Sequence, residues 1–178
     1  LPKLPFSISN LKNITLVACG SSYYSGLVAR EWFEKFTRIK VDVEIASEFR
    51  YREAPMDSSG LTIFISQSGE TADTLAALKH CKKLNQKTVS IVNVPNSSMS
   101  RNSDASLKIF AGPEIGVAST KAFTCQLLVL ACLAISIGRE NGIISNSDEN
   151  EYVESILNLP RLISNVLNKE DDIIDLVN

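Results

Sequence analysis

Short runs of apolar, β-branched residues alternate along this chain with longer stretches whose apolar positions recur every three or four residues. The first pattern is typical of strands buried on both faces, and the second of helices that cover a sheet. Gly and Pro residues mark most of the joints between these segments. We expect strands at residues 14–19 (ITLVAC), 40–45 (KVDVEI), 61–66 (LTIFIS), 87–92 (KTVSIV) and 105–110 (ASLKIF).

The alternation predicts an α/β fold, a three-layer αβα sandwich built on a five-stranded parallel sheet. Helical periodicity then assigns an apolar face to each covering helix. The face of the helix after the first strand is expected to hold Val28, Ala29, Trp32 and Phe36. That of the helix after the third strand is expected to hold Leu75, Leu78, Cys81 and Leu84.

A nearly all-apolar helix is expected from Ser119 to Ile137. Its uncharged run is short for a bilayer span, so a buried helix and no membrane association are predicted. Connector helices are expected to follow the α/β domain, which ends near residue 142. The acidic start at Asp148 suits a helix N-terminus, and Pro160 is expected to kink or split the helix.

Composition narrows the range of functions. The net charge is −2 and the pI about 5.5, so the chain lacks the basic surface that nucleic acid would require. The four cysteines form no C-x-x-C pair and there is a single histidine, His80, so we expect reduced thiols in a cytoplasmic protein and no metal site. The opening LPKLPFSISN lacks signal-peptide features, and we interpret it as the start of a fragment.

The turn after the third expected strand reads SQSGETADT, residues 66–74, and contains no Lys or Arg. Ligands of open parallel sheets bind where strands pass into helices, beside unpaired helix amides, and hydroxyls donate to phosphate oxygens. We predict an anion site here, with Gly69 allowing close backbone approach and Glu70 pointing away, toward solvent or a cation. The candidate donors are Ser66, Gln67, Ser68 and Thr71.

Each polar segment also has a simpler interpretation. The residues of SQSGETADT could cap a helix, because S-x-x-E is a common N-terminal pattern. GSSYYSG, residues 20–26, could be a tight turn with a Ser cap, and it lacks the G-x-G-x-x-G fingerprint of dinucleotide sites. In GPEIGVASTKAFTCQ, residues 112–126, Ser119 or Thr120 is expected to cap the long helix, although the small residues would also allow contact with a sugar.

Together, several segments closely resemble the sugar isomerase (SIS) domain of the glutamine–fructose-6-phosphate aminotransferase family. They cover most of residues 14–137, with Ser21 where many relatives have Thr. SQSGET indicates only the wider SIS family, whereas EIASEFRYR and EIGVASTKAFT are more specific to the aminotransferases. The matching segments are ACGSSYYSGLVAREWFE, DVEIASEFRYR, SQSGETADTLAAL, NVPNSSMSR and EIGVASTKAFTCQL.

The resemblance implies a SIS subdomain at residues 1–142 and a helical connector at 143–178 that leads to a second SIS subdomain. It implies fructose 6-phosphate or glucosamine 6-phosphate as ligand, no cofactor, and a homodimer. The phosphate is expected at the four donors of residues 66–71, and the sugar beside Ser21, Ser22, Ser119 and the carbonyl of Val117.

In such enzymes the catalytic Glu, Lys and His lie in the second subdomain, and the glutaminase nucleophile lies in an N-terminal domain. The resemblance therefore implies that this chain binds sugar phosphate weakly and is not catalytically competent alone. Two alternatives remain at this stage. One is the sugar-phosphate-sensing SIS domain of a regulator, and the other is a nucleotide-binding oxidoreductase.

Overall fold

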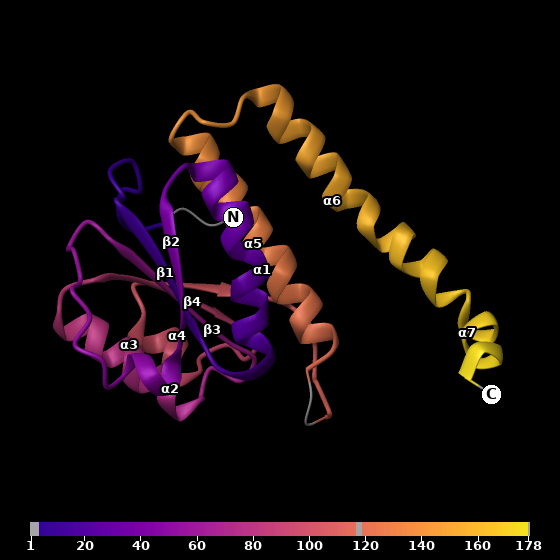
Figure 1. Ribbon diagram of the computed structural model, residues 1–178, viewed down its shortest axis with the longest axis horizontal. Helices are drawn as coiled ribbons and strands as arrows, with labels where there is room; N and C mark the ends of the chain where they lie inside the picture. The colour runs from indigo at the N-terminus through magenta and orange to yellow at the C-terminus, as the bar shows by residue number, and fades with distance from the viewer. Residues whose placement is uncertain (1–3, 117–118, 178) are drawn as a thin grey trace. The chain divides into compact units, whose positions relative to one another are not determined.

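The computed structural model describes residues 4–116 and 119–177, and within them strands and helices alternate as far as α5 (Figure 1). Beyond α5 the described chain is helical. The elements are β1 (Asn13–Ala18), α1 (Gly20–Thr37), β2 (Lys40–Ile45), α2 (Ala46–Phe49), β3 (Leu61–Ser66), α3 (Ala72–Lys83), β4 (Lys87–Val92), α4 (Ser98–Asn102), β5 (Ala105–Lys108), α5 (Lys121–Glu140), α6 (Asn146–Leu167) and α7 (Glu170–Val177).

The five strands form one parallel sheet in the order β2-β1-β3-β4-β5, which confirms the predicted fold class. Helices α1 and α5 lie side by side on one face, and α2, α3 and α4 cover the other (Figure 1). Every residue of the central strand β3 is buried. This burial on both faces explains why β3 is mostly apolar on both sides, with Thr62 and Ser66 as its two polar residues.

The pleat of the sheet divides its apolar side chains between two cores. Along β3, Ile63 and Ile65 pack in the core beneath α1 and α5, while Phe64 packs in the core beneath α2 and α3. Phe33 of α1 and Leu78 of α3 are fully buried on their respective sides. The sheet is therefore the middle layer of a sandwich with a closed core on each face.

The predicted helix faces were partly wrong. On α1 the buried face runs through Ser22, Gly26, Ala29 and Phe33, while Val28 is 43% exposed. Small residues allow α1 to lie close to the sheet, since a Cβ added at Gly26 would come within 3.2 Å of a Val43 methyl group. On α3 the fully buried residues are Thr74, Ala77, Leu78 and Cys81, and Leu75 packs against the same core while partly buried. The prediction was wrong for Leu84, because the helix ends at Lys83 and Leu84 is its exposed C-cap.

Two predicted boundaries were also wrong. β5 ends at Lys108 because Phe110 adopts a positive φ of 53°, which is incompatible with an extended strand. α6 runs unbroken through Pro160, whose carbonyl accepts a hydrogen bond from the Ser164 hydroxyl at 2.9 Å. The acidic helix start was correct, because Asp148 forms a reciprocal capping box with Ser145.

The described chain divides into two compact units after Ile143. The first unit contains the sheet and helices α1 to α5. α5 has the length and apolar composition of a membrane span, but Leu130, Leu133, Ala134 and Ile137 pack in the core beneath it, as in a core helix. The second unit contains α6 and α7, and none of their described residues is buried.

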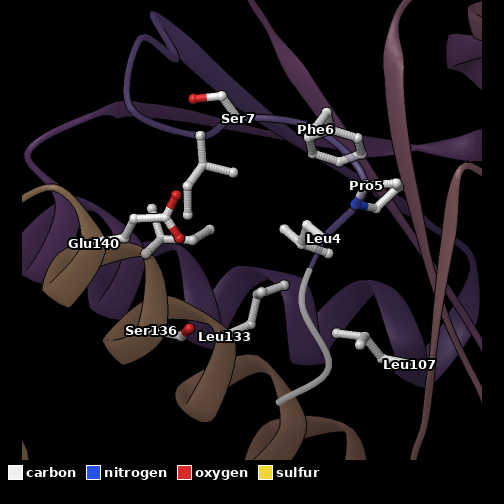
Figure 2. Close-up of a pocket in the computed structure, with 10 residues that line it drawn as sticks. Leu4, Pro5, Phe6, Ser7, Leu107, Leu133, Ser136 and Glu140 are labelled. Carbon is white, nitrogen blue, oxygen red and sulfur yellow. The ribbon is translucent and has the colours of Figure 1, made fainter.

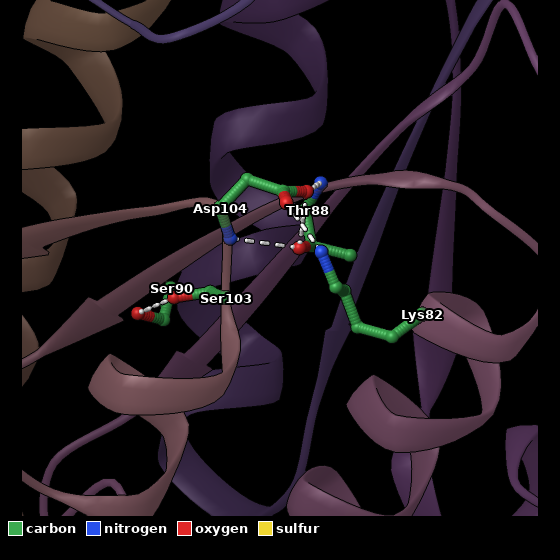
Figure 3. Close-up of polar contacts among 5 residues, drawn as sticks. All are labelled: Lys82, Thr88, Ser90, Ser103 and Asp104. Carbon is green, nitrogen blue, oxygen red and sulfur yellow. Dashed lines mark hydrogen bonds and ion pairs between the residues drawn. The ribbon is translucent and has the colours of Figure 1, made fainter.

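A polar cluster fixes the start of β5 against β4 (Figure 3). The Asp104 carboxylate accepts hydrogen bonds from the Thr88 amide and hydroxyl, both at 2.8 Å, and pairs with the Lys82 ammonium. The Asp104 amide donates back to the Thr88 hydroxyl at 3.0 Å. Desolvation alone would raise the pKa of Asp104, but the Lys82 and Thr88 hydrogen bonds outweigh it, so the pKa lies below the usual value of 3.8.

We predict that Asp104→Asn lowers the free energy of unfolding by about 1–2 kcal/mol at pH 7, because it removes charged hydrogen bonds. A group with a depressed pKa stabilises the fold above its unfolded pKa and loses that contribution as the pH falls through its folded pKa. The difference between variant and parent should therefore shrink from pH 5 down to about pH 3. Urea titrations across this range measure it, with the exposed Glu31→Gln as control.

Candidate functional site

The neighbouring strands β1 and β3 mark the place where the order of strands in the sheet changes direction, because the chain leaves them toward opposite sides of the sheet. From β1 the chain proceeds to β2 at one edge, and from β3 to β4 on the other side, with α1 and α3 on opposite faces. Ala18 is paired with Ile65, so the turns that leave the two strands begin side by side. Such switch points are the usual ligand sites of open α/β sheets.

Three hydroxyls lie in the turn between β3 and α3. The Ser66 hydroxyl accepts a hydrogen bond from the Gly69 amide at 3.0 Å and lies 2.9 Å from the Thr71 hydroxyl. The Ser68 hydroxyl accepts from the Glu70 amide at 3.1 Å. One proton of the Ser66–Thr71 pair and the proton of Ser68 have no acceptor among the described residues, so both are available to a ligand.

The helix-cap interpretation of this turn is wrong. Thr71 is the N-cap of α3, but its side chain makes no capping hydrogen bond. Within the described residues, the Ala72, Asp73 and Thr74 amides also have no side-chain acceptor. The amides at the positive end of α3 thus remain open beside hydroxyl donors, which is an arrangement that favours an anion.

Both carboxylates near the start of α3 are engaged elsewhere. Glu70 accepts a hydrogen bond from the Ser98 amide of α4 at 2.6 Å, rather than pointing only to solvent or a cation. Asp73 pairs with Arg50 at 2.6 Å, and that hydrogen bond raises the pKa of Arg50. These contacts limit the repulsion that either carboxylate would exert on an anion at the turn.

The residues predicted after β1 divide between two environments. Ser21 is half-buried in the first turn of α1 and has no hydrogen bond to another described residue through its side chain. Ser22 is buried, and its hydroxyl accepts a hydrogen bond from the Gln126 amide group of α5 at 2.9 Å. Because that bond uses Ser22 as an acceptor, its own proton stays free to donate. Neither serine caps α1, whose N-cap is Cys19.

The third predicted segment is only partly described. Ser119 is half-buried just before α5, and Val117 lies outside the described residues. The prediction that Ser119 or Thr120 caps α5 was correct for the position alone, because Thr120 is the N-cap residue but its side chain does not accept a hydrogen bond from the first helix amides. Glu114 provides the acceptor instead, because its carboxylate accepts from the Thr120 amide at 2.8 Å and from the Ala122 amide at 3.3 Å.

Sequence reasoning missed residues that hold the site from a distance. Gln126 is fully buried and joins α5 to Ser22 and Ser25 of α1. The sequence did contain a sign of this role, since Gln126 is a polar side chain within a nearly all-apolar helix. Asn93 had no such signal, although it accepts from the Ala111 amide at 3.0 Å and donates to the Gly112 carbonyl at 2.7 Å, which fixes the loop after β5.

A cavity of about 650 Å³ lies at the carboxyl ends of β3, β4 and β5, beside the switch point. Gln67 lines it together with Asn93 and Phe110, so this predicted donor stands between the cavity and the hydroxyl turn. A second cavity, of about 400 Å³, lies between residues 4–8 and the far half of α5 (Figure 2). Glu140, the last residue of α5, lines this second cavity, which shows that it lies far from the switch-point turns.

The described residues contain no group of three or more His, Cys, Asp or Glu side chains arranged to hold a metal. The described cysteines are free thiols, and burial raises the pKa of Cys81 to about 11, which keeps it protonated. The donors that the described residues place at the switch point are hydroxyls and helix amides, which are neutral.

Comparisons with known proteins agree with this geometry. The chain is 55% identical over 168 residues to a glutamine–fructose-6-phosphate aminotransferase (isomerizing) of Bradyrhizobium diazoefficiens, and 53% identical over 173 residues to that of Zymomonas mobilis. These matches cover 94% and 97% of the chain but only 28% of each relative.

A solved structure shares the fold. The C-terminal domain of glucosamine-fructose-6-phosphate aminotransferase from Francisella tularensis is 42% identical with a TM-score of 0.92, over 95% of this chain and 48% of that domain. The SIS domain model matches residues 7–136, which include both switch-point turns. The chain therefore belongs to the SIS domain family, and is similar to one part of the isomerising glutamine–fructose-6-phosphate aminotransferases.

Proposed function

We propose that the switch-point turns bind the phosphate of fructose 6-phosphate or glucosamine 6-phosphate, and that the chain acts as the first SIS subdomain of an isomerising glutamine–fructose-6-phosphate aminotransferase. The observation that carries this proposal is the set of unused donors at the start of α3. Hydroxyl protons and helix amides converge there without a competing side chain.

The proposed roles follow the chemistry of each side chain. Ser66, Gln67, Ser68 and Thr71 hold the phosphate through neutral donors, so that the ester is bound without a fixed cation and is readily released. Ser21 and Ser22 line the sugar, with Ser119 and the carbonyl of Val117 nearby. The orientation of Ser22 supports its role, since Gln126 leaves its proton free.

The relatives favour an enzyme over a regulator, because both aminotransferases match nearly the whole chain at more than half identity. The proposal extends to a cytoplasmic homodimer. Exposed apolar residues on the outer layer, Val28 of α1 and Leu128 of α5, support a contact with a second copy.

We predict that the chain binds fructose 6-phosphate with a dissociation constant near 1 mM, equivalent to about −4 kcal/mol. Ser68→Ala and Thr71→Val should each weaken binding by about tenfold, because each removes a hydrogen bond to a charged group. Titration calorimetry or ³¹P NMR measures this. Ser59→Ala is a matched control. The Ser59 hydroxyl also makes a local turn contact, with Asp57, but Ser59 precedes β3 and therefore lies at the amino ends of the strands, opposite the site.

We predict that the chain alone forms no glucosamine 6-phosphate from fructose 6-phosphate with glutamine or ammonia. The proton transfer between C1 and C2 of the sugar requires a positioned acid or base. The single histidine, His80, lies near the C-terminal end of α3, away from the switch point. A coupled assay for the amino sugar tests this expectation. Steady product formation would refute the proposal that catalysis requires residues of a second subdomain.

We also propose that residues 143–178 connect this subdomain to a second one. Many apolar residues of α6 and α7 are exposed, among them Leu157 at 73% and Leu167 at 67% exposure. A helix with so large an apolar stripe requires a cover in its native protein. The solved Francisella domain, of which this chain spans 48%, is long enough to supply one.

The connector makes a prediction about stability. In this chain, Leu157→Ala should change the free energy of unfolding by less than about 0.5 kcal/mol, whereas Leu130→Ala in the core should cost about 2–5 kcal/mol. In a polypeptide that contains both subdomains, the cost of Leu157→Ala should exceed about 1 kcal/mol. Denaturant titrations compare the two, and an unchanged cost would contradict the proposal.

A further inference from the structure

The hydroxyl turn is bound to the segment that follows the next strand. The Gln67 backbone carbonyl accepts a hydrogen bond from the Asn93 backbone amide at 3.0 Å. The Gly69 carbonyl accepts one from the Met99 backbone amide, also at 3.0 Å. The third contact is the Glu70 carboxylate, which accepts from the Ser98 amide at 2.6 Å. Three of the four turn positions from 67 to 70, namely 67, 69 and 70, are therefore connected to the 93–99 segment.

Close packing reinforces these contacts. Gly69 has a positive φ of 68°, and a Cβ added to it would lie 2.1 Å from the Ser97 hydroxyl oxygen. The sequence analysis expected Gly69 to make room for a ligand, but in the structure it makes room for the start of α4. Met99 is fully buried beside it in the core beneath α2 and α3. The turn therefore rests on a rigid support.

Glu70 is the one contact in this set that a side chain makes. Its pKa is lowered, first by the Ser98 amide hydrogen bond, and Arg101 contributes a further attraction. Glu70 lies between two proposed ligand residues, Ser68 and Thr71. Its charge opposes an anion at the turn, so any favourable effect on anion binding must come from its hydrogen bond to Ser98.

We propose that Glu70 is a positioning residue, whose hydrogen bond to the Ser98 amide holds the hydroxyl turn in the geometry that accepts a phosphate. The inference rests on the proposed function for its ligand. It assigns two opposite effects to Glu70: the acceptor oxygen organises the turn, while the charge weakens anion binding. Variants that separate these effects test the proposal.

Glu70→Gln and Glu70→Ala carry the same charge and differ in the acceptor oxygen. Ser98→Pro removes the donor while keeping the Glu70 charge. Proline suits the site because Ser98 is the first residue of α4 and Ser97 before it is extended, with φ −63° and ψ 164°. The probes are fructose 6-phosphate and inorganic phosphate, titrated separately into the 178-residue chain.

We expect Glu70→Gln to bind both probes as tightly as the parent or up to about threefold more tightly, since it loses only the repulsive charge. Glu70→Ala should bind about tenfold more weakly than Glu70→Gln, and Ser98→Pro about tenfold more weakly than the parent. Equal affinities for Glu70→Ala and Glu70→Gln would overturn the proposal. Parent-like binding by Ser98→Pro would overturn it as well.

A ligand-free measurement separates this inference from the proposed function. Hydrogen exchange of the Met99 and Gly69 amides reports whether the turn is held to α4. Exchange at both should accelerate about tenfold in Glu70→Ala and stay within about twofold in Glu70→Gln. Unchanged exchange in Glu70→Ala contradicts the positioning role, whether or not the parent binds. Failure of the parent to bind fructose 6-phosphate, with exchange as expected, contradicts only the proposed function.

Discussion

The structure depends on the topological reversal between β1 and β3. Right-handed crossovers that leave the adjacent parallel strands β1 and β3 in opposite directions across the sheet place α1 and α3 on opposite faces. Neither helix can then cover the other's N-terminus, and both helices begin at the carboxyl ends of neighbouring strands. The unpaired amides at these helix starts lie where open α/β sheets usually bind their ligands, and the proposed site makes use of them.

The carboxylates near the switch point of this acidic chain are each tied to a donor, which limits their repulsion of the anion proposed to bind there. Glu70 is bound to the Ser98 amide, Asp73 to Arg50, and Glu114 to the amides that begin α5. The pKa of Glu114 is lowered first by the Thr120 amide, so it stays ionised as the cap of α5. Local hydrogen bonding, rather than net charge, thus determines the electrostatics of the site.

The hydroxyls of the site are also held by hydrogen bonds from within the protein. Ser66, Ser68 and Ser22 each accept one hydrogen bond from within the protein, from an amide of their own turn or from Gln126. These bonds fix the oxygen positions before a ligand arrives and leave hydroxyl protons to donate. Groups held in this way lose little conformational entropy when a ligand binds, which favours binding by the proposed site.

The sequence by itself determined the fold class, the approximate strands and the turn that carries the donors. These features follow from local periodicity and turn chemistry, which short segments specify alone. Tertiary structure decided which residues form hydrogen bonds with one another. Gln126 is bonded to Ser22, 104 positions away in the sequence, and Glu70 to Ser98, 28 positions away. It also moved the buried face of α1 toward small residues, because the fit of a helix to a sheet depends on the opposing surface and not on the helix's own pattern.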